Sequence, residues 1–237
     1  MCIRDRYYNT TGYNNVALGP AALFANTEGS NNIALGNQAL RNNNTAYSNN
    51  NIAIGASTLY SNTSGNYNVA IGGNSLNANT YGYSNTALGH NALNSNTSAG
   101  NNTAVGYAAL RYTTTGYYNV AVGSQALYNN TTGQDNIAIG KEALTFNTTG
   151  NYNVAIGGFI QNVSGSSNTA IGISTKMNSF SGSVILGARA EATDHGQFAL
   201  GSSYHPIGPI AIESLTSNRT LEINLNGNLY KVMMYKA

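Results

Sequence analysis

Charged side chains are scarce in this 237-residue chain, at 8% of the residues against about 25% in typical soluble domains. Tryptophan is absent, proline occurs three times and cysteine once. A single cysteine excludes a disulfide framework and a cysteine-based metal cluster. A net charge of +2 gives no basic patch for nucleic acid, and no apolar run is long enough to cross a bilayer as a helix. Hydrophobic residues still make up 41% of the chain, which argues against disorder.

The first six residues, MCIRDR, differ in composition from the rest of the chain, because they hold the only cysteine and three charges, and the next twenty-one residues hold none. This start resembles the short spurious ends left by adapter sequence in assembled metagenomic reads. We therefore expect residues 1–6 to be a non-native scar and the native N-terminus to be missing.

A repeat dominates the remainder of the chain. The phrase NTSGNYNVAIGG at residues 62–73 returns as NTTGNYNVAIGG at residues 147–158, a separation of five times 17 residues. Each repeat contains an apolar step that ends in glycine, such as VAIG or IALG. The spacing of these glycines is 17, then 19, then six times 17, and finally 15, 15 and 14 residues. They are Gly19, Gly36, Gly55, Gly72, Gly89, Gly106, Gly123, Gly140, Gly157, Gly172, Gly187 and Gly201.

This repeat predicts an all-β parallel β-solenoid, or β-roll, of about twelve coils over residues 7–202. Apolar residues alternate over only four positions, which is the period of a strand, and Asn, Gly, Thr and Ser between the steps favour turns over helix interiors. With one coil per repeat, equivalent residues stack about 4.8 Å apart and the rod is on the order of 55 Å long.

Two columns of large apolar residues are expected to fill the coil. One lies four residues after the repeat glycine: Leu23, Leu40, Leu59, Leu76, Leu93, Leu110, Leu127 and Leu144. The other lies just before the glycine and is predicted to be the core ladder: Leu18, Leu35, Ile54, Ile71, Leu88, Val105, Val122, Ile139, Ile156, Ile171, Leu186 and Leu200.

Alanine occupies eleven of the twelve positions two residues before the glycine, with Ile185 as the exception. Strand side chains alternate, so these alanines lie on the face opposite the pre-glycine column. A column of small residues indicates that something packs closely against it, either another part of the same coil or two other chains around a threefold axis. We expect the second arrangement, a parallel homotrimer, because a small coil encloses little volume.

Asparagine forms a third kind of column. The residue before each apolar step predicts a stacked amide ladder: Asn15, Asn32, Asn51, Asn68, Asn85, Asn102, Asn119, Asn136, Asn153 and Asn168. A second ladder, interrupted by Thr113, runs through Asn26, Asn43, Asn62, Asn79, Asn96, Asn130 and Asn147. Asparagine tolerates left-handed turns and pairs along stacks, so both ladders are interpreted as turn structure and not as ligand sites.

The N-[VIT]-A-[ILV]-G steps resemble the head repeats of trimeric autotransporter adhesins. The expanded form with A-L-x-x-N-T-T-G looks closer to repeats in bacteriophage tail fibres. The resemblance covers roughly residues 9–202. It implies a left-handed trimeric β-roll and a role in attachment to a host surface.

The last residues, 203–237, are expected to cap the solenoid. Pro206 and Pro209 cannot donate ladder hydrogen bonds, and Asn226-Gly227 lies between two alternating runs, a strong hairpin signal. The end is too short and too polar for the membrane anchor of an autotransporter, which favours a fibre tip over an anchored adhesin.

Titratable residues give weak evidence of chemistry. His90 lies in a variable column, and Asp194-His195 lies in a turn. We therefore expect no enzyme activity, no catalytic residue, no metal and no cofactor. Exposed tyrosines are typical of surfaces that grip sugars or proteins. The expected receptor-contacting surface is Tyr67, Tyr118, Tyr152, Tyr204 and His205.

The predicted function is therefore that of a virion tail-fibre segment that binds a host-surface glycan or protein, without nucleic acid as a partner and without membrane insertion. A bacterial surface or secreted adhesin is the main alternative. Ice binding is a weaker alternative, because the column beside the threonine column mixes Glu28, Ser64, Tyr81 and Thr115. The threonine column itself is Thr27, Thr63, Thr80, Thr97, Thr114, Thr131 and Thr148. A glycan-cleaving tailspike using Glu191 and Asp194 is a further alternative.

Overall fold

The computed structural model describes residues 7–162, 164–201, 220–225 and 228–233. The chain divides into two compact units, residues 1–206 and residues 207–237, which are described separately. All regular elements of the described residues are strands. They are β1 Val16–Leu18, β2 Ile33–Leu35, β3 Ile52–Ile54, β4 Val69–Ile71, β5 Thr86–Leu88, β6 Thr103–Val105, β7 Val120–Val122, β8 Ile137–Ile139, β9 Val154–Ile156, β10 Gln161–Asn162, β11 Thr169–Ile171, β12 Lys176–Asn178, β13 Val184–Leu186, β14 Phe198–Leu200, β15 Thr220–Leu225 and β16 Asn228–Met233.

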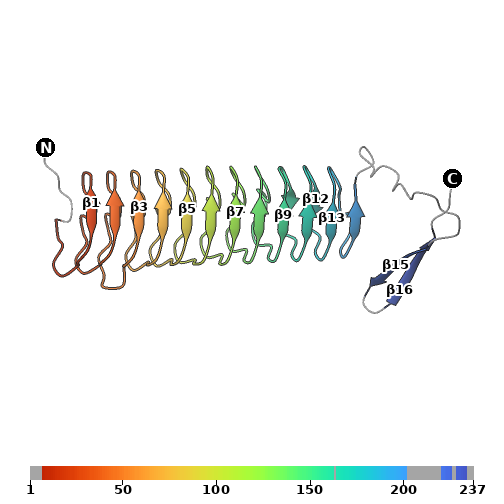
Figure 1. Cartoon of the computed structure of the whole chain (residues 1–237), viewed down its shortest axis with the longest axis horizontal. Helices are drawn as coiled ribbons and strands as arrows, with labels where there is room; N and C mark the ends of the chain where they lie inside the picture. The colour runs from red at the N-terminus through yellow and green to blue at the C-terminus, as the bar shows by residue number, and fades with distance from the viewer. Residues whose placement is uncertain (1–6, 163, 202–219, 226–227, 234–237) are drawn as a thin grey trace. The chain divides into compact units, whose positions relative to one another are not determined.

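The first unit is a parallel β-solenoid, as predicted. Twelve three-residue strands lie side by side in chain order in one sheet, from β1 to β9 and on through β11, β13 and β14 (Figure 1). Each strand pairs with the next in the register of the repeat, so that Ala104 lies beside Ala121 and Val105 beside Val122. Between strands the chain returns through turns, which places equivalent residues of successive coils above one another.

The interior of the coil holds the alanine column and the leucine column. The alanines of β2 to β9 and β11 are fully buried, and so are all eight leucines from Leu23 to Leu144. The leucine backbone is left-handed, with φ between 48° and 55°. The prediction of a buried leucine column is confirmed.

The prediction that the pre-glycine column forms the core is wrong. The pre-glycine residues point out of the coil: Leu18 is 61% exposed and Ile156 41% exposed, while Ile54 is half-buried. Alternation places alanine and the large residues on opposite faces but does not say which face turns inward. The narrow coil has room for a methyl group facing a leucine, so the alanines turn inward and pack against their own chain. The residues on the outer face are Leu18, Leu35, Ile54, Ile71, Leu88, Val105, Val122, Ile139, Ile156, Ile171, Leu186 and Leu200.

The first asparagine ladder is confirmed, and it satisfies every polar atom of its amides. From Asn32 to Asn168 the side chains are buried. From Asn15 to Asn153, each amide oxygen accepts the backbone N–H of the next ladder asparagine at 2.9–3.1 Å, and the oxygen of Asn168 accepts that of Ser183 at 2.9 Å. Each Nδ2 donates to a carbonyl in the following turn at 2.7–2.9 Å. Because unpaired buried amides are costly, this ladder fixes the register of the stack.

The second asparagine ladder is also present, and its interruption leaves a defect. At every asparagine of the ladder except Asn130, the Nδ2 donates to the amide oxygen of the preceding coil at 2.6–2.9 Å. Thr113 replaces the ladder asparagine between Asn96 and Asn130 and has no side-chain amide. As a result the Asn96 oxygen and the Thr113 hydroxyl are both buried without a hydrogen-bond partner, and Asn130 donates only to the carbonyl of Gly133.

Restoring the ladder should stabilise the protein. In Thr113→Asn, the new amide would donate to Asn96 and accept from Asn130, and we expect the free energy of unfolding to rise by about 1–2 kcal/mol. Chemical denaturation measures the change. Thr113→Val is the matched control, because it removes the unpaired hydroxyl without supplying a ladder. A gain for valine equal to that for asparagine would contradict the ladder explanation.

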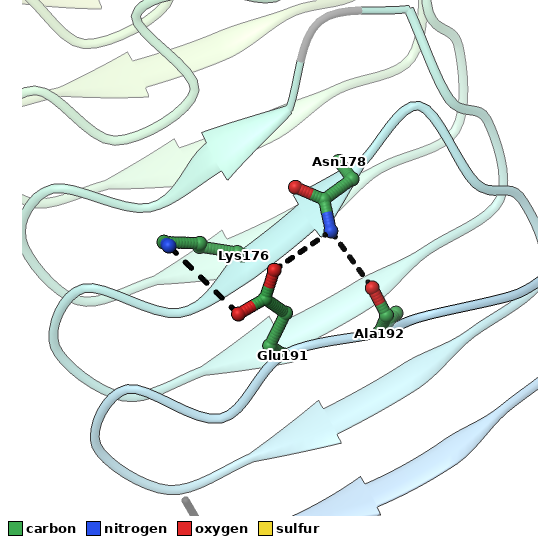
Figure 2. Close-up of polar contacts among 4 residues, drawn as sticks. All are labelled: Lys176, Asn178, Glu191 and Ala192. Atoms are coloured by element: carbon green, nitrogen blue, oxygen red, sulfur yellow. Dashed lines mark hydrogen bonds and ion pairs between the residues drawn. The ribbon is translucent and has the colours of Figure 1, made fainter.

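The coils shorten near the end of the solenoid, and the leucine column ends there. In these coils the returning segment is extended and forms β10 and β12, which pair in parallel. Side chains then alternate, so Ile160 and Met177 are buried while Lys176 and Glu191 point outward. Figure 2 shows Lys176 and Asn178 directed at the Glu191 carboxylate, at 3.8 and 3.2 Å.

The second unit contains a β-hairpin. Strands β15 and β16 are antiparallel, with Leu225 opposite Asn228, as the hairpin prediction requires. Asn226 and Gly227, the predicted turn, lie outside the described residues. Pro206 and Pro209 lie outside the described residues.

Candidate binding surface

The turns that lead into the first asparagine ladder form one edge of the rod and carry the predicted tyrosines. Tyr67, Tyr118 and Tyr152 each directly precede a ladder asparagine, and their side chains are 56–63% exposed. All three have left-handed backbones, with φ of 55–58°. The structure therefore places them in one column along this edge. Tyr204 and His205, the other two residues of the predicted surface, lie outside the described residues.

The backbone at this column is unfavourable for tyrosine. Left-handed geometry suits glycine and asparagine and strains other residues by about 1–2 kcal/mol. Most other coils place Asn, Ser or Asp at the same position. Positions with a strained backbone cluster at functional sites, so this exposed column is a candidate for a binding surface.

The strain at this column can be tested directly. Replacing Tyr152 with asparagine should leave the fold intact and raise the free energy of unfolding by about 0.5–1 kcal/mol. Thermal or chemical unfolding measures the change. Tyr107→Asn is the control, since Tyr107 is 52% exposed but does not have a left-handed backbone. Equal effects of the two substitutions would contradict the assignment of strain.

A tyrosine cluster in the same turns was not predicted from the sequence. The rings of Tyr83 and Tyr117 lie 6.5 Å apart, and the Tyr118 ring lies 6.2 Å from that of Tyr117. Gly100 occupies the coil between them, and a Cβ there would come within 3.0–3.1 Å of the Tyr83 ring. The signal was available, because residues 83, 100 and 117 share one column of the repeat. The cluster presents an aromatic platform that spans three coils.

Two arginines are held between aromatic rings on the return side of the coil. The Arg41 guanidinium lies 5.6 Å from the Phe24 ring and 5.5 Å from the Tyr60 ring, and it donates to the Tyr60 hydroxyl at 2.7 Å. Arg111 is placed similarly between Tyr112 and Tyr128. A hydrogen bond with Tyr128 raises the pKa of the Tyr112 phenol, and the charge of Arg111 opposes this effect. The rings and phenol oxygens stabilise two guanidinium groups that keep their charge, and we interpret these contacts as structural.

The remaining titratable residues do not form a reaction centre in the part of the chain that the structure describes. His90 is exposed and stacks on Tyr107 at 6.0 Å. The Asp194 carboxylate accepts the backbone N–H of His195 at 2.7 Å, whereas Glu191 pairs with Lys176. Within the described ranges, no three His, Cys, Asp or Glu side chains gather in a group that could hold a metal ion.

The threonine column has a structural use. The hydroxyl of Thr63 donates to the carbonyl of Thr80, and that of Thr80 donates to Thr97, at 2.9–3.0 Å. The same contact repeats at Thr97, Thr114 and Thr131. These hydroxyl protons are therefore committed to holding neighbouring coils together.

Comparison with protein-family models, with curated proteins and with solved structures found no match for this chain. A search of the described residues for an apolar helix of membrane-spanning length found none.

Proposed function

We propose that this chain is a segment of a trimeric attachment fibre of the phage tail-fibre type, in which three parallel, left-handed solenoids associate along their length and present a surface to a host receptor. The observation that carries this proposal is the uncovered apolar face of the twelve-stranded sheet.

This outer face is two side chains wide and continuous along the stack. One column is the pre-glycine column, and the other lies two residues earlier in each strand. Of these twenty-four positions, three are threonine and the others are apolar. Several side chains on the face are well exposed in the middle of the stack, including Leu88 at 45% and Ile139 at 40%. Soluble monomers rarely expose contiguous apolar patches larger than a few hundred Å², and this one runs for about 55 Å.

A second and third copy of the same chain are the partners that fit this face. It is straight, uncharged and repeats at the spacing of the coils, so only a partner with the same axial repeat matches it along the whole length. A cyclic trimer needs two different patches on each chain, one for each neighbour. The two columns supply them, with mostly β-branched residues in one and mostly Leu and Ile in the other. Burial of both columns would add the apolar core that a thin coil lacks.

Attachment is the activity that the rest of the surface supports. The edge with the tyrosine column and the platform of Tyr83, Tyr117 and Tyr118 offers exposed rings beside amide side chains, which is typical of recognition surfaces. The edge and the apolar face are different sides of the coil, so a trimer would bury the face and leave three copies of the edge accessible.

The mass of the intact chain in solution tests this proposal. Sedimentation equilibrium should give three times the 24.8 kDa of one chain at micromolar concentration. Binding of the labelled protein to a panel of bacterial cells then tests attachment. A stable monomer would contradict the trimer, and a trimer that binds no cell surface would leave a fibre without the proposed attachment role.

A further inference from the structure

The solenoid departs from its repeat at one coil near the start of the described chain. The interval between Gly36 and Gly55 is 19 residues, where the neighbouring intervals are 17. The two extra residues lie in the turn before β3, between Asn43 and Ser48. In Figure 1 this orange turn projects beyond the turns of the later coils. The side chain of Tyr47 is 74% exposed on it.

The projecting turn forms one wall of a pocket of about 540 Å³. The pocket lies on the same edge of the rod as the tyrosine column, since Asn31 and Asn50 occupy the column of Tyr67 in their own coils. Its volume falls within the range of small-molecule sites, roughly 300–1,000 Å³. The lining comes from three successive coils, and its main side chains are Tyr13, Glu28, Ser30, Asn31, Asn49 and Asn50.

The floor of the pocket is fixed by hydrogen bonds. Asn49 accepts the backbone N–H of Ser30 at 2.7 Å and donates to the carbonyl of Ala46 at 2.6 Å. Ser30 is 5% exposed, and its hydroxyl accepts the backbone N–H of Tyr13 at 3.1 Å. Asn49 therefore joins the projecting turn to the coil beneath it, so the pocket exists before any ligand enters.

Polar groups without internal partners face this pocket. Among the described residues, neither the Glu28 carboxylate nor the Asn50 side-chain amide has a hydrogen-bond or ion-pair partner. The Asn31 amide oxygen accepts from Asn14 at 3.2 Å. The Tyr13 side chain is 63% exposed. The pocket thus offers a carboxylate, amides and an aromatic ring to a ligand.

We propose that this pocket binds an uncharged saccharide, as the receptor site of the attachment function on which this inference rests. A sugar hydroxyl both donates and accepts, and an asparagine amide provides both groups together. A carboxylate accepts from two neighbouring hydroxyls. The C–H face of a pyranose ring is apolar and packs on an aromatic ring such as that of Tyr13. One pocket therefore supplies the three contacts that a sugar residue needs.

Other ligand classes fit the lining less well. A phosphate or another anion would meet the Glu28 carboxylate without any lysine or arginine in the lining. An apolar molecule would find few apolar side chains, since amides and hydroxyls predominate. A basic peptide would find one carboxylate and no second acid. The balance of one acid, several amides and one ring favours a neutral, hydroxyl-rich ligand.

The test uses the full chain on an array of bacterial surface polysaccharides and neutral oligosaccharides. Two variants probe the pocket: Tyr13→Ala, and deletion of Ala46 and Tyr47, which restores the 17-residue interval and removes the wall. Tyr107→Asn is the matched control, because Tyr107 is also an exposed tyrosine but belongs neither to the tyrosine column nor to the pocket lining. We expect neutral saccharides to bind to the wild type, at least tenfold weaker binding for both pocket variants, and no loss for the control. Affinity should be unchanged between 50 and 500 mM salt, because no ion pair forms.

Each outcome decides between the pocket and the wider function. Saccharide binding that survives both pocket variants would overturn the pocket and leave attachment by another part of the edge. Binding that falls steeply with salt and is lost in Glu28→Gln would overturn the saccharide and indicate a cationic ligand. If the protein binds bacterial cells but no saccharide of the array, the inference fails and the proposed function stands. If it binds neither, both fail. Thermal unfolding of each variant shows whether a loss of binding reflects a loss of fold, and Tyr13→Ala serves if the deletion does not fold.

Discussion

Replacing Gly106 with alanine is expected to destabilise the solenoid by roughly 3–6 kcal/mol. Gly106 ends an apolar step with φ of +131°, a conformation that residues with a side chain rarely adopt. A Cβ there would lie 2.6 Å from the carbonyl oxygen of Gly123 in the next coil. That atom belongs to the backbone of the stack and cannot move without breaking the strand register. Backbone strain and steric overlap therefore act together.

Gly116→Ala is the matched control for this prediction. Gly116 lies in the turn, and its added Cβ would also approach a backbone oxygen, that of Gly133, at 2.3 Å. The equivalent position in other coils is already Ala99 or Ser48, both buried. The turn can therefore adjust in a way that the stacked glycines after β6 and β7 cannot, and the cost at Gly116 should be under about half of that at Gly106. Denaturant unfolding measures both. If both substitutions lowered the free energy of unfolding by similar amounts, the positive φ and the stacked backbone at Gly106 would not explain its loss of stability.

Most of the fold could be predicted from the repeat. Equal spacing of the glycines gave the number of coils, and the columns of asparagine and leucine gave the two ladders and half of the core. The shorter intervals after Gly157 marked where β10 and β12 replace the leucine turn, although their spacing alone does not show that Ile160 and Met177 take over the interior. The spacing of the repeats and the residues that share a column can both be read directly from the sequence.

The sequence pattern did not show which face of the strands points into the coil. An alternating pattern is symmetric between inside and outside, and only the width of the coil decides that alanine faces the leucine column. The prediction that Leu18, Ile71 and their equivalents are core followed the usual preference for burying large residues. The trimer inference from the alanine column loses its basis, because those alanines pack within one chain. The outer face of Val, Ile and Leu replaces that argument with a stronger one.

The edge of the rod that carries the candidate site was predicted only in part. Tyr67, Tyr118 and Tyr152 are exposed in one column of this edge, and that column was visible in the repeat. The pocket depended on a departure from the repeat, the two extra residues of the coil before β3. That interval of 19 residues was visible in the sequence, but the wall it builds over Asn49 and Ser30 results from contacts between coils. An irregularity in a repeat can therefore shape the surface of the rod in a way that its consensus does not.

The second large effect is expected at the outer face. In the double variant Val122→Lys and Ile139→Lys, each trimer would hold six ammonium groups at two adjacent levels around the axis. Both side chains are partly exposed on one chain, at 36% and 40%, so the isolated coil tolerates lysine there. In the trimer the same charges would be desolvated and close to one another, at a cost of several kcal/mol for each buried ion. We expect the solution mass to fall from three chains to one.

Ser124→Lys combined with Thr132→Lys adds the same number of lysines and the same charge to the same part of the stack and is the control. Ser124 comes directly after the repeat glycine, in the column where Lys141 is exposed in the next coil, and the Thr132 side chain is exposed in the turn before β8. Neither residue lies on the apolar face, so this variant should remain trimeric, and circular dichroism should show folded coils in both proteins. Dissociation of both variants would indicate a general effect of charge. A double variant on the apolar face that stays trimeric would move the interface elsewhere on the coil, because six buried lysines cannot be accommodated around an axis that this face surrounds.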